Sequence, residues 1–197
     1  MKKLLILIVL PVFLFTGCEN RMLKVVANLK LDETLPVDKT GQFLEYRTIT
    51  PEDVRADIDI PEEATIDEVN IESMSVQVVK LADNVATAVT ISGYLQIGSE
   101  TPTIFNDYTA LLVGIDEPFL GLNSLVDIGV QRLRSKIEGY LKSTDQEPIN
   151  LTVAGNSSPT AGNRIHANIN IRMTGSITYH VCQNVPFFMG GEKCESQ

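Results

Sequence analysis

The chain has 197 residues, with 16 Lys and Arg against 25 Asp and Glu and a net charge of −9 at pH 7. This length suits one sizeable domain and is barely enough for two. An acidic chain without clustered Lys and Arg argues against nucleic acid as a partner and against electrostatic docking on anionic lipid.

Residues 1–18 (MKKLLILIVLPVFLFTGC) have the pattern of an export signal: two lysines, then an apolar run. The run is only about a dozen residues, whereas a membrane-spanning helix needs about 20. Cys18 directly follows Gly17, and the segment resembles the lipobox of bacterial lipoproteins, although Phe15 stands where that motif usually has leucine. The resemblance implies a signal peptide over 1–17, acylation such as palmitate at Cys18, and membrane anchoring in the bacterial cell envelope, on its periplasmic or outer-surface side.

Cleavage would remove two lysines and no acidic residue, leaving 14 basic and 25 acidic residues and a charge of −11. Attachment to the membrane must then come from N-terminal acyl chains. The resemblance to bacterial lipoproteins implies two or three such chains, and two are enough for stable anchoring. Residues 18–23 are expected to form a short tether, whose five residues after the cysteine span roughly 17 Å when extended. We therefore expect a single β-rich domain over 24–197, close to the bilayer.

Period-two alternation of apolar residues predicts strands over 24–31 and 42–49. A short helix is expected to start after Thr50, with Pro51 in its first turn. Residues 72–81 and 85–97 are expected to pair as a hairpin around the turn 82–84, and a further short strand is predicted over 108–114.

An apolar stripe at helical spacing predicts an amphipathic helix over 124–142. Ser124 with Asp127 three residues later resembles a capping box at its start. The stripe consists of Val126, Val130, Leu133, Ile137 and Leu141.

Strands are predicted again over 149–154, 164–173 and 176–185. The segment 174–176 (Thr-Gly-Ser) suits a hairpin turn between the last two strands. One face of this hairpin is expected to be buried and the other exposed or half-exposed. The buried face holds Ile169, Ile171, Tyr179 and Val181, and the wet face holds His166, Asn168, Asn170 and His180.

Two cysteines, Cys182 and Cys194, remain after the lipidation candidate. In an exported chain they are expected to form a disulfide, which would stabilise the fold by roughly 3 kcal/mol in the chain-entropy model. Free thiols or a metal pair are the alternatives, but no CxxC or Cys/His spacing favours a metal.

Neither the histidines nor the acidic segment gives a clear metal site. In the predicted hairpin, His166 and His180 lie roughly 13 Å apart, too far for one zinc ion. Residues 52–72 hold nine Asp and Glu against one Arg, a composition that could supply calcium ligands but lacks an EF-hand pattern. A solvated strand is the competing interpretation, and the alternation around Asp57 and Asp59 favours it, so we expect no metal and no cofactor.

No catalytic motif of the GxSxG, SxxK or HExxH type is present. The sequence therefore predicts a non-enzymatic envelope lipoprotein that binds an envelope protein partner or supports envelope structure. A carrier of an apolar ligand or lipid is the main alternative, and an envelope hydrolase is a weaker one.

The predicted fold is mainly β: an antiparallel two-sheet sandwich of seven to nine strands with one long amphipathic helix. The alternative is an α+β fold in which a single curved sheet wraps the helix.

Overall fold

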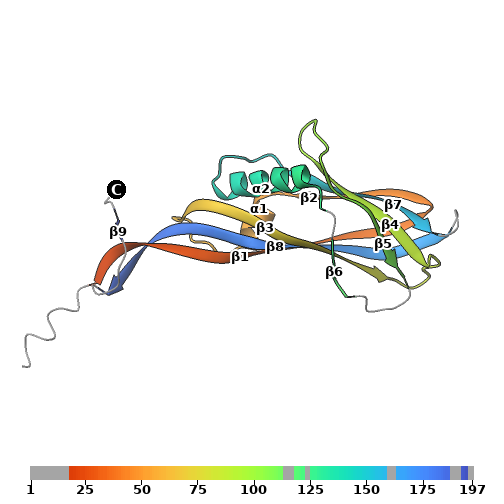
Figure 1. The fold of residues 1–197 in the computed structure, drawn as a ribbon, viewed down its shortest axis with the longest axis horizontal. Helices are drawn as coiled ribbons and strands as arrows, with labels where there is room; N and C mark the ends of the chain where they lie inside the picture. Colours follow the sequence, from red (N-terminus) through yellow and green to blue (C-terminus); the bar gives the residue numbers. More distant parts are fainter. Residues whose placement is uncertain (1–17, 113–117, 123–124, 159–162, 187–191, 195–197) are drawn as a thin grey trace, which may run out of the picture.

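A computed structural model describes residues 18–112, 118–122, 125–158, 163–186 and 192–194. The chain forms mostly strands, with two helices among the described residues (Figure 1). The elements in chain order are β1 (Cys18–Thr40), β2 (Gln42–Ile49), α1 (Pro51–Ala56), β3 (Thr65–Lys80), β4 (Ala88–Gln96), β5 (Thr103–Leu111), β6 (Leu120–Gly121), α2 (Asp127–Leu141), β7 (Ile149–Ser158), β8 (Arg164–Pro186) and β9 (Glu192–Lys193).

The strands form two antiparallel sheets. The first has the order β6-β3-β8-β1-β9 and the second has the order β2-β7-β4-β5. β1 and β8 run along most of the length of the molecule, with the second sheet over one end and α1 and α2 beside it (Figure 1). α2 packs against α1 and β3, so the first sheet is covered partly by the helices and partly by the second sheet. The prediction of a mainly β fold with two antiparallel sheets is confirmed.

The hydrophobic core is one continuous cluster that draws on both sheets and on α2. Along β8, alternate residues from Ile165 to Val181 are buried, and the residues between them are half-exposed. The predicted faces of this segment are therefore correct. α2 contributes Leu133, Ile137 and Tyr140, which are buried almost completely.

The start of α1 follows local chemistry. Thr50 is the N-cap: its Oγ1 accepts a hydrogen bond from the backbone N–H of Asp53 at 3.2 Å, and the Asp53 carboxylate accepts from the Thr50 N–H at 2.8 Å. Pro51 supplies the fixed φ of the first turn. α2, by contrast, begins after Val126 without a side-chain cap, and the predicted cap Ser124 lies outside the described residues.

The predicted hairpin at 174–176 is wrong, because β8 passes straight through these residues. Gly175 pairs with Leu29 of β1 on one side and with Ile71 of β3 on the other. A Cβ atom at this position would collide with the backbone carbonyl of Asn70. The glycine is therefore needed for close approach of β3, at an irregularity in its register, and not for a turn.

The predicted hairpin of 72–81 with 85–97 is also wrong, because β3 and β4 belong to different sheets. The connection stays bonded to β8 as it crosses between the sheets. The N–H of Leu81 donates to the carbonyl of His166 at 2.8 Å, and the N–H of Val85 donates to the carbonyl of Arg164 at 3.0 Å. β4 then pairs with β5 and β7.

The first strand is much longer than the predicted 24–31, since β1 extends from Cys18 to Thr40. Pro36 lies inside it, opposite Asn168 of β8. In the described residues, β9 joins the other side of β1 only at Arg21 and Met22, so the missing N–H of Pro36 is tolerated at an edge. Similarly, β5 begins at Thr103 rather than at residue 108, and part of the predicted 108–114 strand falls outside the described residues.

Candidate functional site

The end of the molecule that begins at Cys18 is built as paired strand. Cys18 lies opposite Pro186, and pairing with β8 continues without a break along β1. The residues 18–23, predicted as a tether separate from the domain, are therefore part of the first sheet. No helix in the described ranges is long and apolar enough to cross a membrane.

A disulfide closes this end. Cys182 on β8 is bonded to Cys194, with 6.0 Å between their Cα atoms, as predicted from the cysteine count. The bond holds β9 against β1, where Met22 pairs with Glu192. β9 has only two residues, and the disulfide adds to the hydrogen bond from the Cys194 N–H to the carbonyl of Asn20 at 3.3 Å and to the Lys193–Glu19 ion pair at 3.6 Å.

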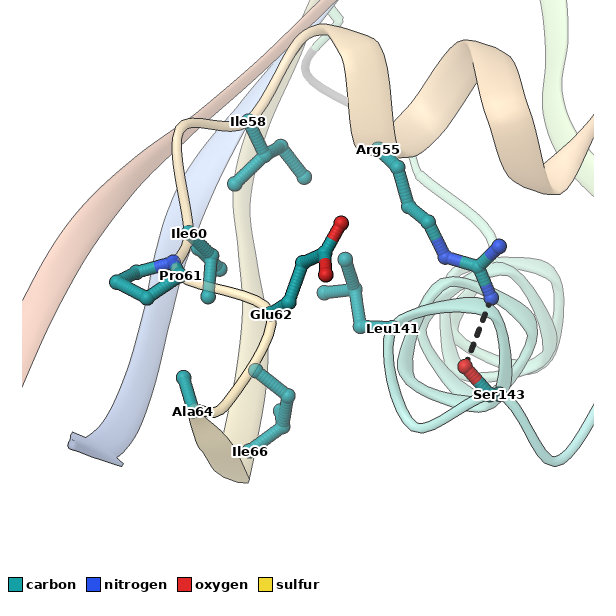
Figure 2. A pocket seen from close by; sticks show the side chains of 9 residues that line it. All are labelled: Arg55, Ile58, Ile60, Pro61, Glu62, Ala64, Ile66, Leu141 and Ser143. Carbon is teal, nitrogen blue, oxygen red and sulfur yellow. Dashed lines mark hydrogen bonds between the residues drawn. The ribbon is translucent and has the colours of Figure 1, made fainter. Parts of the chain in front are cut away.

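A pocket of about 470 Å³ opens where α1, the loop after it and the end of α2 meet (Figure 2). Arg55 and Glu62 reach toward it from different sides (Figure 2). Its other polar residue is Ser143, and its apolar walls are Ile58, Ile60, Pro61, Ala64, Ile66 and Leu141.

The guanidinium of Arg55 is already engaged at this pocket. Its Nη2 donates to the backbone carbonyl of Tyr140 at 2.6 Å and to Oγ of Ser143 at 3.0 Å. The arginine thus satisfies carbonyl and hydroxyl groups at the C-terminal end of α2 and joins the two helices. No histidine or cysteine is among the described residues that line the pocket, and its ionisable side chains are those of Arg55 and Glu62.

A second ionic cluster fixes the segment that follows α2. Lys136 is buried, and its Nζ lies 2.8 Å from a carboxylate oxygen of Asp145. This hydrogen bond holds the pKa of Asp145 below its usual value of 3.8. The hydroxyl of Tyr140 donates to the carbonyl of Glu147 at 2.6 Å, and burial raises the pKa of that phenol to about 12. The Lys136 ammonium, the Asp145 carboxylate and the Tyr140 hydroxyl each bind a neighbouring group of the fold, which indicates a structural role.

The outer face of the second sheet is chemically unusual for this acidic chain. On three of its four strands, the outward positions are the even-numbered residues 42–48 on β2, 150–156 on β7 and 88–96 on β4, which the register places in adjacent rows. The fourth strand, β5, only borders this surface, with the exposed Leu111 opposite Ala88 and the exposed Asp107, whose N–H donates to Oγ of Ser92 at 3.0 Å. We call this surface the tyrosine face. Its side chains are those of Gln, Asn, Thr, Ser, Tyr, Ala and Leu, and none is charged.

A shallow groove of about 410 Å³ crosses the tyrosine face. Tyr46 is 69% exposed and Leu44 is 65% exposed, although the odd-numbered neighbours Phe43 and Ile49 are buried. The groove is lined by both of these exposed residues together with Tyr94, Leu95, Gln96, Thr101, Asn150 and Thr152. Sequence alternation placed Leu44 and Tyr46 on one side of their strand, but it did not show which strands lie beside them.

The predicted metal candidates are scattered. His166 and His180 lie on one strand, 14 residues or roughly 48 Å apart, which corrects the separation predicted from the hairpin. His180 Nδ1 lies 2.8 Å from a carboxylate oxygen of Asp67, and His166 Nδ1 lies 2.6 Å from the carbonyl of Ala82.

In the acidic segment 52–72, Asp53 caps α1, whereas Asp57 and Asp59 are exposed. Within the described ranges, no group of three or more His, Cys, Asp or Glu side chains is arranged to hold a metal ion. The segment is therefore divided between a helix start, a loop and a strand and does not converge on one point.

No protein-family model and no curated protein matches this chain. The function is therefore argued from the geometry above.

Proposed function

We propose that this protein is a lipid-anchored, non-enzymatic binding protein of the bacterial cell envelope. Acylation at Cys18 would attach it to the membrane, and the β-rich part over 24–197 would act as one domain that binds an envelope partner. In this view the two sheets are the layers of a sandwich, and α2 is its one long amphipathic helix.

The observation that carries the proposal is that Cys18 is itself a paired residue of β1, opposite Pro186 of β8. An acyl group there would be joined directly to the first sheet, with no unpaired linker between the cysteine and the strand, since Cys18 and the residues that follow it are paired with β8. The disulfide at the same end fits an exported protein, because such bonds persist in oxidising compartments.

A binding role is also supported by the nature of the pockets. The Arg55 pocket combines one cation, one carboxylate and a hydroxyl that already accepts a hydrogen bond from the arginine. The groove on the tyrosine face is lined by amides, hydroxyls, phenol rings and two leucine side chains. Both sets of groups can recognise a ligand through hydrogen bonds and packing.

The alternative role as a lipid carrier rests on the Arg55 pocket. Its six apolar lining residues, together with Arg55, could receive the end of an acyl chain that carries a negative group. The core itself offers little room, because the cavity among Leu31, Met74 and Leu133 measures about 10 Å³. Lipid extracted with the purified protein and lost in Leu141→Arg would favour the carrier role.

Metabolic labelling of the full-length chain with palmitate tests the anchor. Wild type should take up label and fractionate with membranes, whereas Cys18→Ser should remain unlabelled and unprocessed. Cys182→Ser is the matched control, because it removes a cysteine without touching the lipobox and should still be labelled. Equal labelling of Cys18→Ser and wild type would show that the anchor is wrong.

A further inference from the structure

We propose that the tyrosine face binds a neutral polysaccharide chain. The inference deepens the proposed binding role by naming its ligand class, and it does not depend on acylation of Cys18. An experiment can therefore contradict the proposed glycan site without contradicting the proposed anchor, and the reverse.

The argument begins with the rows across the sheet. Tyr46 on β2 lies opposite Thr152 on β7, and Thr152 lies opposite Tyr94 on β4. Because neighbouring strands are about 4.8 Å apart, the two tyrosines stand about 9.6 Å apart with a small side chain between them. This arrangement gives two aromatic platforms over which two sugar rings of an extended chain, with one further ring between them, could lie.

The groups around these platforms are hydrogen-bonding groups of the kind that sugar hydroxyls need. The next row holds Thr48, Asn150 and Gln96. The Thr48 hydroxyl donates to Oδ1 of Asn150 at 2.7 Å, which fixes that amide beside the groove before any ligand arrives. Amides and hydroxyls can both donate and accept, as a sugar hydroxyl does, while an aromatic ring packs against the C–H face of the sugar.

Charge narrows the ligand class further. The chain carries 25 acidic residues, yet the tyrosine face holds no Asp, Glu, Lys or Arg. The outer face of the first sheet differs, since it carries the ion pairs Arg164–Asp38 and Arg172–Asp32. A surface without charges offers no partner for the phosphates or carboxylates of an anionic polymer, so a neutral chain is the occupant that fits.

A protein partner fits this surface less well. Stable protein interfaces bury about 800 Å² on each side around an apolar core. On the three strands of the tyrosine face, the large apolar side chains that are exposed are Leu44 and Tyr46, and Leu111 on the neighbouring β5 is exposed opposite Ala88. A groove lined by two phenol rings, two leucines and a set of amides and hydroxyls matches a thin chain better than a broad protein surface.

The test is binding of the full-length protein, in detergent, to a panel of neutral and acidic oligosaccharides. We expect saturable binding to at least one neutral chain of linked hexoses or N-acetylhexosamines. Tyr46→Ala and Tyr94→Ala should each weaken it by about tenfold or more, whereas Tyr46→Phe, which keeps the ring, should weaken it less. Ile128→Ala on α2 is the matched control, since Ile128 is 59% exposed but lies off the face, and it should bind like wild type.

Three outcomes would overturn the proposal: no neutral oligosaccharide binds, only acidic ones bind, or binding is unchanged in both tyrosine variants. Capture of a protein through Tyr46 with no glycan binding would also overturn it, in favour of a protein ligand. Cys18→Ser should bind the glycan as wild type does. If Cys18→Ser loses palmitate labelling but keeps glycan binding, the binding site is independent of the membrane anchor.

Discussion

Gly175 in the middle of β8 lies directly against the backbone carbonyl of Asn70 on β3, leaving no room for a Cβ atom. Gly175→Ala should therefore push β3 away from β8 or force a backbone shift, at a cost of about 2–4 kcal/mol in the free energy of unfolding. Chemical denaturation followed by circular dichroism measures this change. Gly121→Ala is the matched control, because nothing lies within 4 Å of a Cβ there, and it should change stability by less than about 0.5 kcal/mol. Equal effects would show that β3 does not approach β8 in this way.

Ile171 is 3% exposed on the inner face of β8, whereas Asn168 on the opposite face is half-exposed. Ile171→Asp should place a carboxylate in the apolar core and cost several kcal/mol. Asn168→Asp should shift the thermal midpoint only slightly, because its side chain already meets water. Thermal melts of the two variants compare the faces, and similar losses would mean that the inner and outer faces of β8 are misassigned.

Lys136 is buried beside Asp145, so Asp145→Asn should leave the ammonium without its nearer carboxylate at 2.8 Å and with the more distant one of Glu147 at 3.9 Å. We expect a loss of about 1–3 kcal/mol in the free energy of unfolding near pH 7. Glu138→Gln is the control, because the Lys142–Glu138 pair is more exposed and should contribute less than about 0.5 kcal/mol.

The same pair predicts a pH dependence. The folded pKa of Asp145 lies below its usual value of 3.8 because of the hydrogen bond with Lys136. A lowered folded pKa gives stability that is present above the unfolded pKa and is lost as the pH falls through the folded pKa. The difference between wild type and Asp145→Asn should thus be constant above about pH 5 and shrink below about pH 4. A gap that widened in acid would contradict this origin of the stability.

Calcium and zinc at millimolar concentration should give at most a small, non-saturating shift of the thermal midpoint. A specific ion site would bind the folded state and raise the midpoint in a saturable way. The exposed Asp57 and Asp59 are the residues to test in the acidic segment. Saturable stabilisation that disappears in Asp57→Asn or Asp59→Asn would turn this segment into a binding site.

Features controlled by neighbouring residues could be predicted from the sequence. The cap at Thr50, the bounds 42–49 of β2, the buried and wet faces of β8 and a helix near 127–141 all follow from local chemistry or from alternation along one segment. Pairing between distant strands could not be predicted in the same way. Gly175 looks the same in a turn as in a crowded strand, and only the presence of β3 distinguishes the two.

The candidate site was missed for the same reason. The outward residues of β2, β4 and β7 are far apart in the sequence, and their lack of charge has meaning only once the strands are known to be neighbours. Tyr46 and Tyr94 are 48 residues apart in the chain and meet in one row only through β7. Had this strand order been known, the uncharged even-numbered positions would have revealed the surface.

The unbroken pairing of β1 with β8 has a consequence for the distance and the orientation of the tyrosine face relative to Cys18. Arg47, beside Tyr46, contacts Glu33 of β1 at 3.1 Å, and Glu33 lies 15 residues, or about 50 Å of extended strand, beyond Cys18. A paired strand fixes the orientation of the domain relative to Cys18 as well as its distance from it, whereas a flexible linker limits only the distance. With an acyl chain on Cys18, the paired strands would act as a rigid arm. This arm would hold the tyrosine face at a constant distance from the membrane and in a constant orientation to it. Lengthening the arm by two residues on each strand would change the height of that face while leaving its inward and outward sides as they are.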